Sequence, residues 1–172
     1  MGSFSIGIDI GKKGYICIND NGHYTFHRMP LIKNELDYSK IHKILEPYEG
    51  GNGLVTFEKL GVIFGSSKGT AFSMGYQAGA IEMACVALSI PYMKVPAKTW
   101  QKELFIGIPE ISKSNNKTKS GTSRDTKAMA LLAAKQLYPT VDIPISIATK
   151  KEHDGAVDAL LICDYGARRY KG

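Results

Sequence analysis

The chain has 172 residues, of which 44% are hydrophobic and 22% are charged, a balance typical of one globular domain with a full hydrophobic core. No apolar run approaches the roughly 20 residues of a membrane-spanning helix, and the first residues lack the basic segment of a signal peptide. We therefore expect a single domain over residues 1–172, no membrane partner and a cytoplasmic location.

The net charge of +6 is unevenly distributed along the chain. Residues 94–135 contain nine Lys or Arg and three Asp or Glu, whereas the rest of the chain contains thirteen of each sign. A local basic excess of this kind indicates a polyanionic partner such as a nucleic acid. From charge alone, a merely solvated basic face is an equally good interpretation.

The first third of the chain predicts four strands and one helix. Residues 4–10 and 14–18 alternate in the manner of strands and are joined by a short turn between two glycines, which is typical of a hairpin. Residues 22–28 predict a third strand, residues 38–48 a short helix with one apolar face, and residues 54–60 a fourth strand.

The remaining elements are mainly helical. A long helix over 70–88 precedes a fifth strand at 92–95 and a short helix at 98–105. Residues 106–123 are polar and basic and predict a mobile loop. A helix capped by Thr122 or Ser123 should then run to Leu137, followed by a loop over 140–150 and a last helix over 154–168. This order predicts an α/β domain with a mixed sheet.

The three cysteines, Cys17, Cys85 and Cys163, are odd in number and lie far apart in apolar segments. This pattern predicts reduced core thiols rather than disulfides or a zinc site.

Four carboxylates occupy positions that the pattern would give to apolar residues. Asp9 lies in the first strand, Glu58 in the fourth, and Asp154 and Asp158 lie four residues apart on one face of the last helix. Two acids on a buried helix face repel each other unless a cation lies between them. Oxygen ligands suit Mg²⁺ or Mn²⁺, and two such ions about 4 Å apart serve in-line displacement at phosphorus. We therefore predict a catalytic site with two metal ions bound by these four acids.

Each acid also has a structural interpretation. Asp9 is suited to a turn because Gly11 follows it, and Glu58 could pair with Lys59 or a distant lysine. Asp154 could be only the N-cap of its helix, a position that Asp favours. Asp158 is the hardest to explain structurally, because an apolar helical turn follows it.

Three short motifs contain acids of this set: residues 6–11 (IGIDIG), 57–59 (FEK) and 158–161 (DALL). They resemble motifs of the RuvC group of Holliday-junction resolvases, particularly the phage-type RuvC-like proteins. Further matches are residues 75–82, 95–100, 125–128 and 164–166. The resemblance covers nearly the whole chain in the right order, which makes the set more specific than any single motif.

The resemblance implies an RNase H-like fold, with a five-stranded mixed sheet flanked by helices. It also implies a homodimer that cuts four-way DNA junctions by two symmetric nicks, leaving 5′-phosphate and 3′-hydroxyl ends. Asp9, Glu58 and Asp158 match the metal-binding acids of the family directly. A bacterial or phage-infected cell would be the setting for such an enzyme.

The chain departs from the family pattern at one ligand. The family places an acid or histidine three residues before the last Asp, where this chain has Gly155. Asp154 keeps the same helical face, only about 40° away, so we expect it to be the fourth ligand. His153 is the alternative, as a ligand or proton carrier.

The remaining site predictions concern DNA and the second subunit. Phe64 could stack on a base in the junction core, and Gly75, Ala78 and Gly79 form a small-residue stripe suited to a dimer interface or to a close contact within the chain. Basic residues are expected to contact phosphates; they are Lys12, Lys13, Lys113, Lys117, Lys119, Arg124 and Lys127.

Other functions fit parts of the pattern. A sugar kinase or actin-like ATPase also has an early Asp-x-Gly hairpin but needs far more chain than this protein has. An RNase H-like nuclease with another substrate, such as RNA–DNA hybrid or flap DNA, shares the fold and the metal site. A DNA-binding module with a decayed site is the non-enzymatic alternative, and Gly155 is the residue that favours it.

Overall fold

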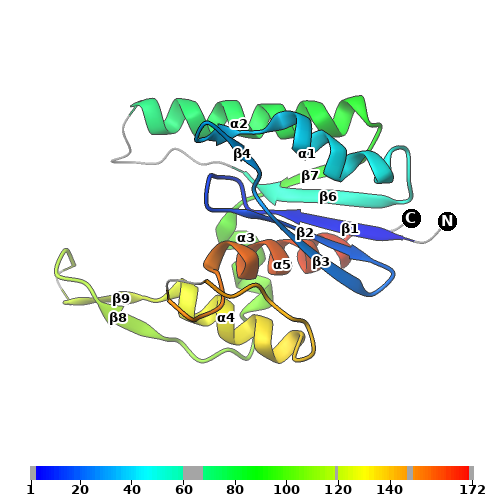
Figure 1. Ribbon diagram of the computed structural model, residues 1–172. Helices are drawn as coiled ribbons and strands as arrows, with labels where there is room; N and C mark the ends of the chain where they lie inside the picture. Colours follow the sequence, from blue (N-terminus) through cyan, green and yellow to red (C-terminus); the bar gives the residue numbers. More distant parts are fainter. Residues whose placement is uncertain (1–2, 60–67, 119, 147–148, 171–172) are drawn as a thin grey trace.

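A five-stranded sheet forms the centre of the protein, whose computed structural model describes residues 3–59, 68–118, 120–146 and 149–170 (Figure 1). The strand order is β3-β2-β1-β6-β7. The first three strands are antiparallel neighbours, whereas β6 and β7 run parallel to β1. The strands are β1 (Phe4–Ile8), β2 (Tyr15–Asp20), β3 (His23–Arg28), β6 (Gly53–Glu58) and β7 (Tyr92–Val95). The expected mixed five-stranded sheet is therefore confirmed.

The parallel pairing of β1 and β6 decides where the acids lie. Every residue of β1 is buried, and β6 is buried up to its last residue, Glu58. Ile8 pairs with Phe57 in register, so both strands end at the same edge of the sheet. Asp9 follows directly after β1, and the two acids therefore reach the same edge from neighbouring strands.

Helices cover both faces of the sheet (Figure 1). On one face lie α1 (Tyr38–Leu45), its short 3-10 continuation η1 (Glu46–Tyr48) and α2 (Lys68–Ala87). They bury a cluster that includes Ile6, Ile8 and Phe57 of the sheet. On the other face lies α5 (Asp154–Ala167), with α3 (Ala97–Leu104) and α4 (Thr126–Leu137) packed against it.

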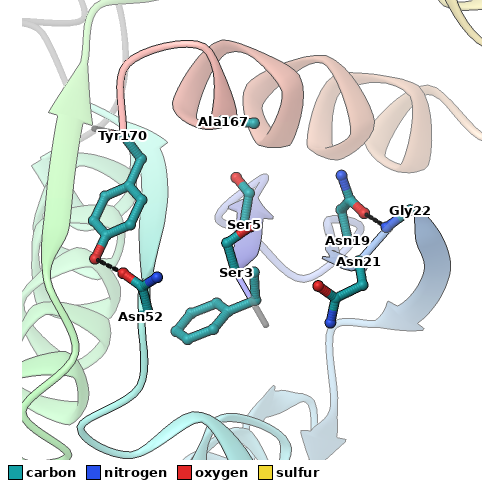
Figure 2. Close-up of a pocket in the computed structure, with 9 residues that line it drawn as sticks. Ser3, Ser5, Asn19, Asn21, Gly22, Asn52, Ala167 and Tyr170 are labelled. Carbon is teal, nitrogen blue, oxygen red and sulfur yellow. Dashed lines mark hydrogen bonds between the residues drawn. The ribbon is translucent and has the colours of Figure 1, made fainter. Parts of the chain in front are cut away.

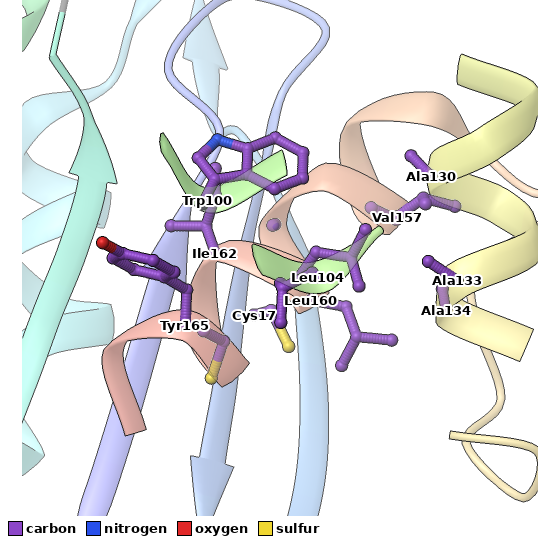
Figure 3. Packing of buried hydrophobic residues seen from close by; sticks show 14 of the residues in the cluster. Cys17, Trp100, Leu104, Ala130, Ala133, Ala134, Val157, Leu160, Ile162 and Tyr165 are labelled. Carbon is purple, nitrogen blue, oxygen red and sulfur yellow. The ribbon is translucent and has the colours of Figure 1, made fainter. Parts of the chain in front are cut away.

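The second cluster of buried side chains fills the space between the sheet, α5, α3 and α4 (Figure 3). Trp100 and Leu104 of α3 enter it from one side, and the alanines of α4, such as Ala133, bring that helix close to α5. Burial of a large aromatic side chain such as Trp100, which is fully inaccessible to solvent, contributes several kcal/mol to stability, roughly 3–5 by truncation.

Glycines allow α5 to lie directly on the strands. A Cβ atom on Gly7 would lie 2.1 Å from the carbonyl oxygen of Ala159 and 2.3 Å from the amide nitrogen of Cys163. A Cβ atom on Gly166 would lie 2.2 Å from Oγ1 of Thr56. Neither position has room for a side chain, so α5 contacts β1 backbone to backbone at Gly7 and packs on the Thr56 side chain of β6 at Gly166.

Two short hairpins differ from the prediction. Residues 106–123 were expected to be a mobile loop, but they contain β8 (Ser112–Ser114), which pairs with β9 (Thr122–Arg124). The prediction relied on apolar content, whereas this hairpin is held by turn hydrogen bonds, such as Asn115 N–H to the Gly121 carbonyl at 2.8 Å. The strands β4 (Leu31–Ile32) and β5 (Glu35–Leu36) were also not predicted.

The start of α4 needs a correction as well. Its N-cap is Asp125, whose side chain accepts a hydrogen bond from the Ala128 amide, rather than Thr122 or Ser123. Both of those residues belong to β9, so the strand continues almost to the helix.

The three cysteines are free and buried, as predicted. No helix in the described part of the chain is both long and apolar enough to span a membrane.

Candidate functional site

Asp9, Glu58 and Asp158 meet where β1 and β6 end and α5 begins. The Asp9 amide donates a hydrogen bond to the Tyr15 carbonyl at 3.0 Å, so Asp9 also closes the β1–β2 hairpin as its turn interpretation predicted. Its carboxylate points to α5, because Oδ2 lies 2.7 Å from the position that a Cβ atom on Gly155 would take. Three elements distant in sequence therefore supply one acidic cluster.

The pKa values of this cluster show that its charges interact. Burial raises the pKa of Asp9 to about 7, and the nearby charges of Asp158 and Glu58 add to this increase. Burial also raises the pKa of Asp158 to about 7, with Glu58 and Asp154 as further causes. Lys127 opposes both increases. A group of half-buried acids with mutual repulsion is a frequent mark of a functional site.

Glu58 has a neutral partner. Nε1 of Trp100 donates a hydrogen bond to its Oε1 at 2.9 Å. Burial raises the pKa of Glu58, and the Trp100 hydrogen bond lowers it. No ion pair of Glu58 with Lys59 or with another lysine is found among the described residues, which give its carboxylate a neutral partner instead of a counter-charge. Sequence reasoning did not assign this role to Trp100, although its motif belonged to the resemblance.

Asp154 lies at the rim of the cluster and is exposed. Nζ of Lys127, on α4, donates a hydrogen bond to its Oδ2 at 2.5 Å. Asp154 is not the N-cap of α5, because that position belongs to His153, whose Nδ1 accepts a hydrogen bond from the Gly155 amide at 3.3 Å. The His153 ring also packs on Tyr15, with the ring centroids 4.9 Å apart.

Gly155 is required by close packing. A Cβ atom there would lie 2.7 Å from the Lys13 carbonyl oxygen and 3.1 Å from Cα of Gly14. These are backbone atoms of the β1–β2 turn and cannot move as a side chain can. The absence of a ligand at this position is therefore coupled to a tight turn beside Asp9.

The donor set suits a hard divalent cation, since Asp9, Glu58 and Asp158 offer only carboxylate oxygens at a half-buried edge. As the side chains stand, no three His, Cys, Asp or Glu residues within the described ranges converge closely enough to chelate a metal ion. Glu58 and Asp154 instead face Trp100 and Lys127. Metal binding would thus require Asp154 to turn from Lys127 toward Asp9 and Asp158, whereas the Trp100 hydrogen bond involves only Oε1 of Glu58.

The basic residues predicted to bind DNA differ in their contacts within the protein. Lys12 pairs with Glu35 at 3.2 Å and Lys113 with Asp125 at 3.4 Å. The guanidinium carbon of Arg124 lies 5.7 Å from the centre of the Phe105 ring. Exposed residues of this set include Lys13 in the β1–β2 turn, Lys117 at the β8–β9 turn and Lys127 beside the acids. Lys119 and Phe64 lie outside the described residues.

The β8–β9 hairpin extends away from the sheet and leads directly into α4 (Figure 1). Its base is fixed by a hydrogen bond of 2.6 Å from the Asp125 amide to the Ile111 carbonyl. Residues 112–124 contain four basic residues and no acid. Since Lys127 follows in the first turn of α4, the hairpin starts close to the acidic cluster.

The long helix α2 has an exposed apolar face. Gly75 and Gly79 are exposed, and no described atom lies within 4 Å of a Cβ atom built on either, so they do not mediate a close contact in this part of the chain. Ala78 instead packs against the core. The large exposed side chains of α2 follow the same face: Phe72 (76% exposed), Tyr76 (62%), Met83 (61%) and Val86 (54%).

A polar pocket of about 410 Å³ lies near the start of β1 and the end of α5 (Figure 2). Its polar groups are largely paired with one another. Tyr170 donates to Asn52 at 2.8 Å, and the Gly22 amide donates to Asn19 at 2.8 Å. Among the described residues, no charged side chain lines it and none of the acids of the cluster does, so the pocket has no part in the proposed catalytic site.

Comparisons with known proteins agree with the fold. No protein-family model and no curated protein matches the chain. Among solved structures, the chain is similar to RuvC of Thermus thermophilus, with a TM-score of 0.58, 15% identity, and coverage of 96% of this chain and 95% of that one. A second similar structure is T. thermophilus RuvC in complex with Holliday junction substrate, with a TM-score of 0.55, 13% identity and coverage of 96% and 95%. The protein therefore has an α/β fold like the RNase H-like fold of RuvC.

Proposed function

We propose that the protein is a structure-selective DNA endonuclease that resolves four-way junctions. It would hydrolyse one phosphodiester bond in each of two strands and leave 5′-phosphate and 3′-hydroxyl ends. One observation carries the proposal: the carboxylates of Asp9, Glu58 and Asp158, whose pKa values are raised chiefly by burial, come together from β1, β6 and α5 at one edge of a RuvC-like fold. A solved neighbour of this fold is a RuvC complex with Holliday junction substrate.

The acids would hold two Mg²⁺ or Mn²⁺ ions, which when bound supply an activated water and stabilise charge on the leaving 3′ oxygen. Asp9, Glu58 and Asp158 are the proposed ligands, with Asp154 as the fourth. Trp100 would orient Glu58 through its indole N–H, in the way that outer residues orient metal ligands. His153 already caps α5 through Nδ1, which leaves Nε2 as its only free nitrogen.

Lys127 has two possible partners in this scheme. In the structure it pairs with Asp154, and this hydrogen bond together with the nearby charges of Asp158 and Asp9 raises the pKa of Lys127. If Asp154 turned to a metal ion, the Lys127 ammonium would become available to a DNA phosphate. This exchange would let one lysine neutralise the acids before binding and the substrate after it.

A second copy of the chain is the proposed partner at the exposed face of α2. Phe72, Tyr76, Gly79, Met83 and Val86 follow each other at alternating intervals of four and three residues, the spacing of a helix–helix seam. A two-fold dimer would place two acidic clusters on one junction, as paired nicks require. Met83→Glu should convert the dimer to monomers in sedimentation, whereas Ile106→Glu, an exposed apolar residue elsewhere, should not.

The activity is tested with a labelled synthetic four-way junction in Mg²⁺ or Mn²⁺, with linear duplex and RNA–DNA hybrid alongside. Paired symmetric nicks on the junction, lost in Asp158→Asn and kept in the exposed control Glu110→Gln, are expected. Cutting mainly of hybrid or flap DNA would leave the metal site in place and refute the junction as substrate. Tight binding without cutting in either metal would indicate a binding module. A cytoplasmic location in a bacterial or phage-infected cell stays a prediction.

A further inference from the structure

A second cavity, of about 400 Å³, opens beside the acidic cluster. The β1–β2 turn contributes Lys13, the segment before α5 contributes Ser146, Thr149 and Lys151, and the start of α5 contributes His153 and Asp154. Lys127 lines this cavity and also a small pocket that contains Asp158. The cavity therefore adjoins the proposed catalytic site, because both are lined by Lys127 and Asp154.

The charge of the cavity is unbalanced. Its two acids already have partners, because Asp154 pairs with Lys127 at 2.5 Å and Glu152 pairs with Lys135 at 2.6 Å. Lys13 and Lys151 have no ion-pair partner within the described ranges, and both are exposed. Two lysines without acidic partners at the mouth of one cavity favour an anionic ligand.

The uncharged polar groups of the cavity are hydrogen-bond donors. Nδ1 of His153 accepts from the Gly155 amide, so a neutral imidazole carries its proton on Nε2. Oγ of Ser146 accepts from the Thr149 amide at 3.4 Å, which leaves the hydroxyl hydrogen of Ser146 free to donate. The Thr149 hydroxyl adds another donor. Ammonium, imidazole and hydroxyl donors together match the acceptor-only oxygens of a phosphodiester.

Backbone hydrogen bonds hold Ser146 and Lys151, two of the residues that line this cavity. The Ser146 amide donates to the Lys151 carbonyl at 2.7 Å, and the Lys150 amide donates to the Ser146 carbonyl at 2.8 Å. Ile145 and Glu152 form a β-bridge, and the His153 amide donates to the Pro144 carbonyl at 2.8 Å. Lys150 adopts a left-handed conformation (φ +55°) to complete the turn. Ser146 and Lys151 are thus fixed relative to α5.

We infer that this cavity binds the backbone phosphate directly next to the one that the proposed nuclease cleaves. The inference rests on the proposed function and adds a positioning role for Lys13 and Lys151, with Ser146, Thr149 and His153 as further donors. By holding the neighbouring phosphate, the cavity would set which bond of the strand lies at the acids. This role does not depend on base identity, since phosphate contacts fix position rather than sequence.

The first test uses four-way junctions with one uncharged methylphosphonate at successive positions along the cleaved strand. In the wild type, one position adjacent to the cut should reduce cleavage by about tenfold, the value of one charge-assisted contact. Lys151→Gln should reduce cleavage of the natural junction by a similar factor. With this variant, a methylphosphonate at the sensitive position should reduce cleavage no further. Lys43→Gln, an exposed lysine of α1, should leave the pattern of the wild type unchanged. If the loss of cleavage caused by Lys151→Gln and the loss caused by the methylphosphonate multiply at every position, the inference is overturned.

The second test does not require cleavage. A ¹⁵N-labelled protein without divalent metal is titrated with a hexanucleotide of thymidine and followed by NMR. The amides of Ser146, Thr149 and Lys151 should shift, and the shifts should be lost in the double variant Lys13→Gln/Lys151→Gln. If the protein cuts no branched DNA but these shifts occur, the phosphate site stands and the proposed nuclease function fails. Binding without shifts at these amides would refute the site itself.

Discussion

Replacing Asp158 with Asn should stabilise the protein in the absence of divalent cations. Burial raises the pKa of Asp158 from 3.8 to about 7, so the folded state holds a proton that the unfolded state releases. As the pH rises from about 4 to about 7, the wild type therefore loses stability, and above that range the loss is complete. Asn has no ionised form, and the variant escapes this loss.

The magnitude follows from the pKa shift. A shift from 3.8 to about 7, at about 1.4 kcal/mol per unit, sets an upper limit of about 4 kcal/mol. Asp9 shares the same repulsion, so the two shifts do not add. The Asn amide must also be accommodated at a half-buried position, and we expect a gain of about 1–3 kcal/mol. For a chain of this size this corresponds to an increase in Tm of roughly 3–8 °C.

Thermal unfolding followed by circular dichroism in EDTA measures the effect at about pH 5 and about pH 8. The gain should be larger at the higher pH, because only there is Asp158 ionised in the folded wild type. Glu110→Gln, which removes an exposed acid, should change Tm little at either pH. A gain that is the same at both values, or a loss at the higher pH, would show that the ionisation of the buried Asp158 does not destabilise the folded protein.

Three further outcomes test the site. About 10 mM Mg²⁺ should stabilise the wild type at about pH 8 by about 1.4 kcal/mol if the Kd for the ion is near 1 mM. Thermal unfolding measures this gain, and an equal gain for Asp158→Asn would show that the ion binds outside the acidic cluster. Trp100→Phe removes the indole N–H from Glu58 and should lower the unfolding free energy by about 1–2 kcal/mol in urea. The pKa of Glu58 should rise in that variant, as an NMR titration of its carboxyl carbon would show, and an unchanged pKa would contradict the role of the hydrogen bond. Gly155→Ala should destabilise the protein by roughly 1–3 kcal/mol because its methyl group meets the Lys13 carbonyl. The control Gly79→Ala, in open space on α2, should stabilise the protein by about 0.5–1 kcal/mol. Comparable urea midpoints for the two variants would contradict the close packing at Gly155.

The main elements could be predicted because their side chains repeat with the period of a strand or a helix. The strands around Ile8 and Phe57 alternate into two hydrophobic layers, and the acid at the end of each interrupts that pattern visibly. Asp158 was recognisable for the same reason, since the next turn of α5 is apolar. Burial thus marks both the core and the charged residues that interrupt it.

The contacts of the site could not be read in this way. The bond from Trp100 to Glu58 joins residues 42 positions apart, and the pair of Lys127 and Asp154 joins two helices. Neither contact produces a periodic pattern in the sequence, because each depends on how α3 and α4 pack on α5. The β8–β9 hairpin escaped prediction for a different reason: turn hydrogen bonds hold it, and a polar sequence with such bonds looks like a loop.

The contact of Gly7 and Gly166 with their neighbours has a consequence for how the protein can vary. Because backbone meets backbone between β1 and α5, the separation of Asp9 from Asp158 is set by atoms that every residue type shares. Side chains elsewhere in the two clusters can then be exchanged for others of similar volume without moving the carboxylates. Gly7 cannot be exchanged in this way, since any side chain there would push α5 off the sheet and move Asp158 away from Asp9.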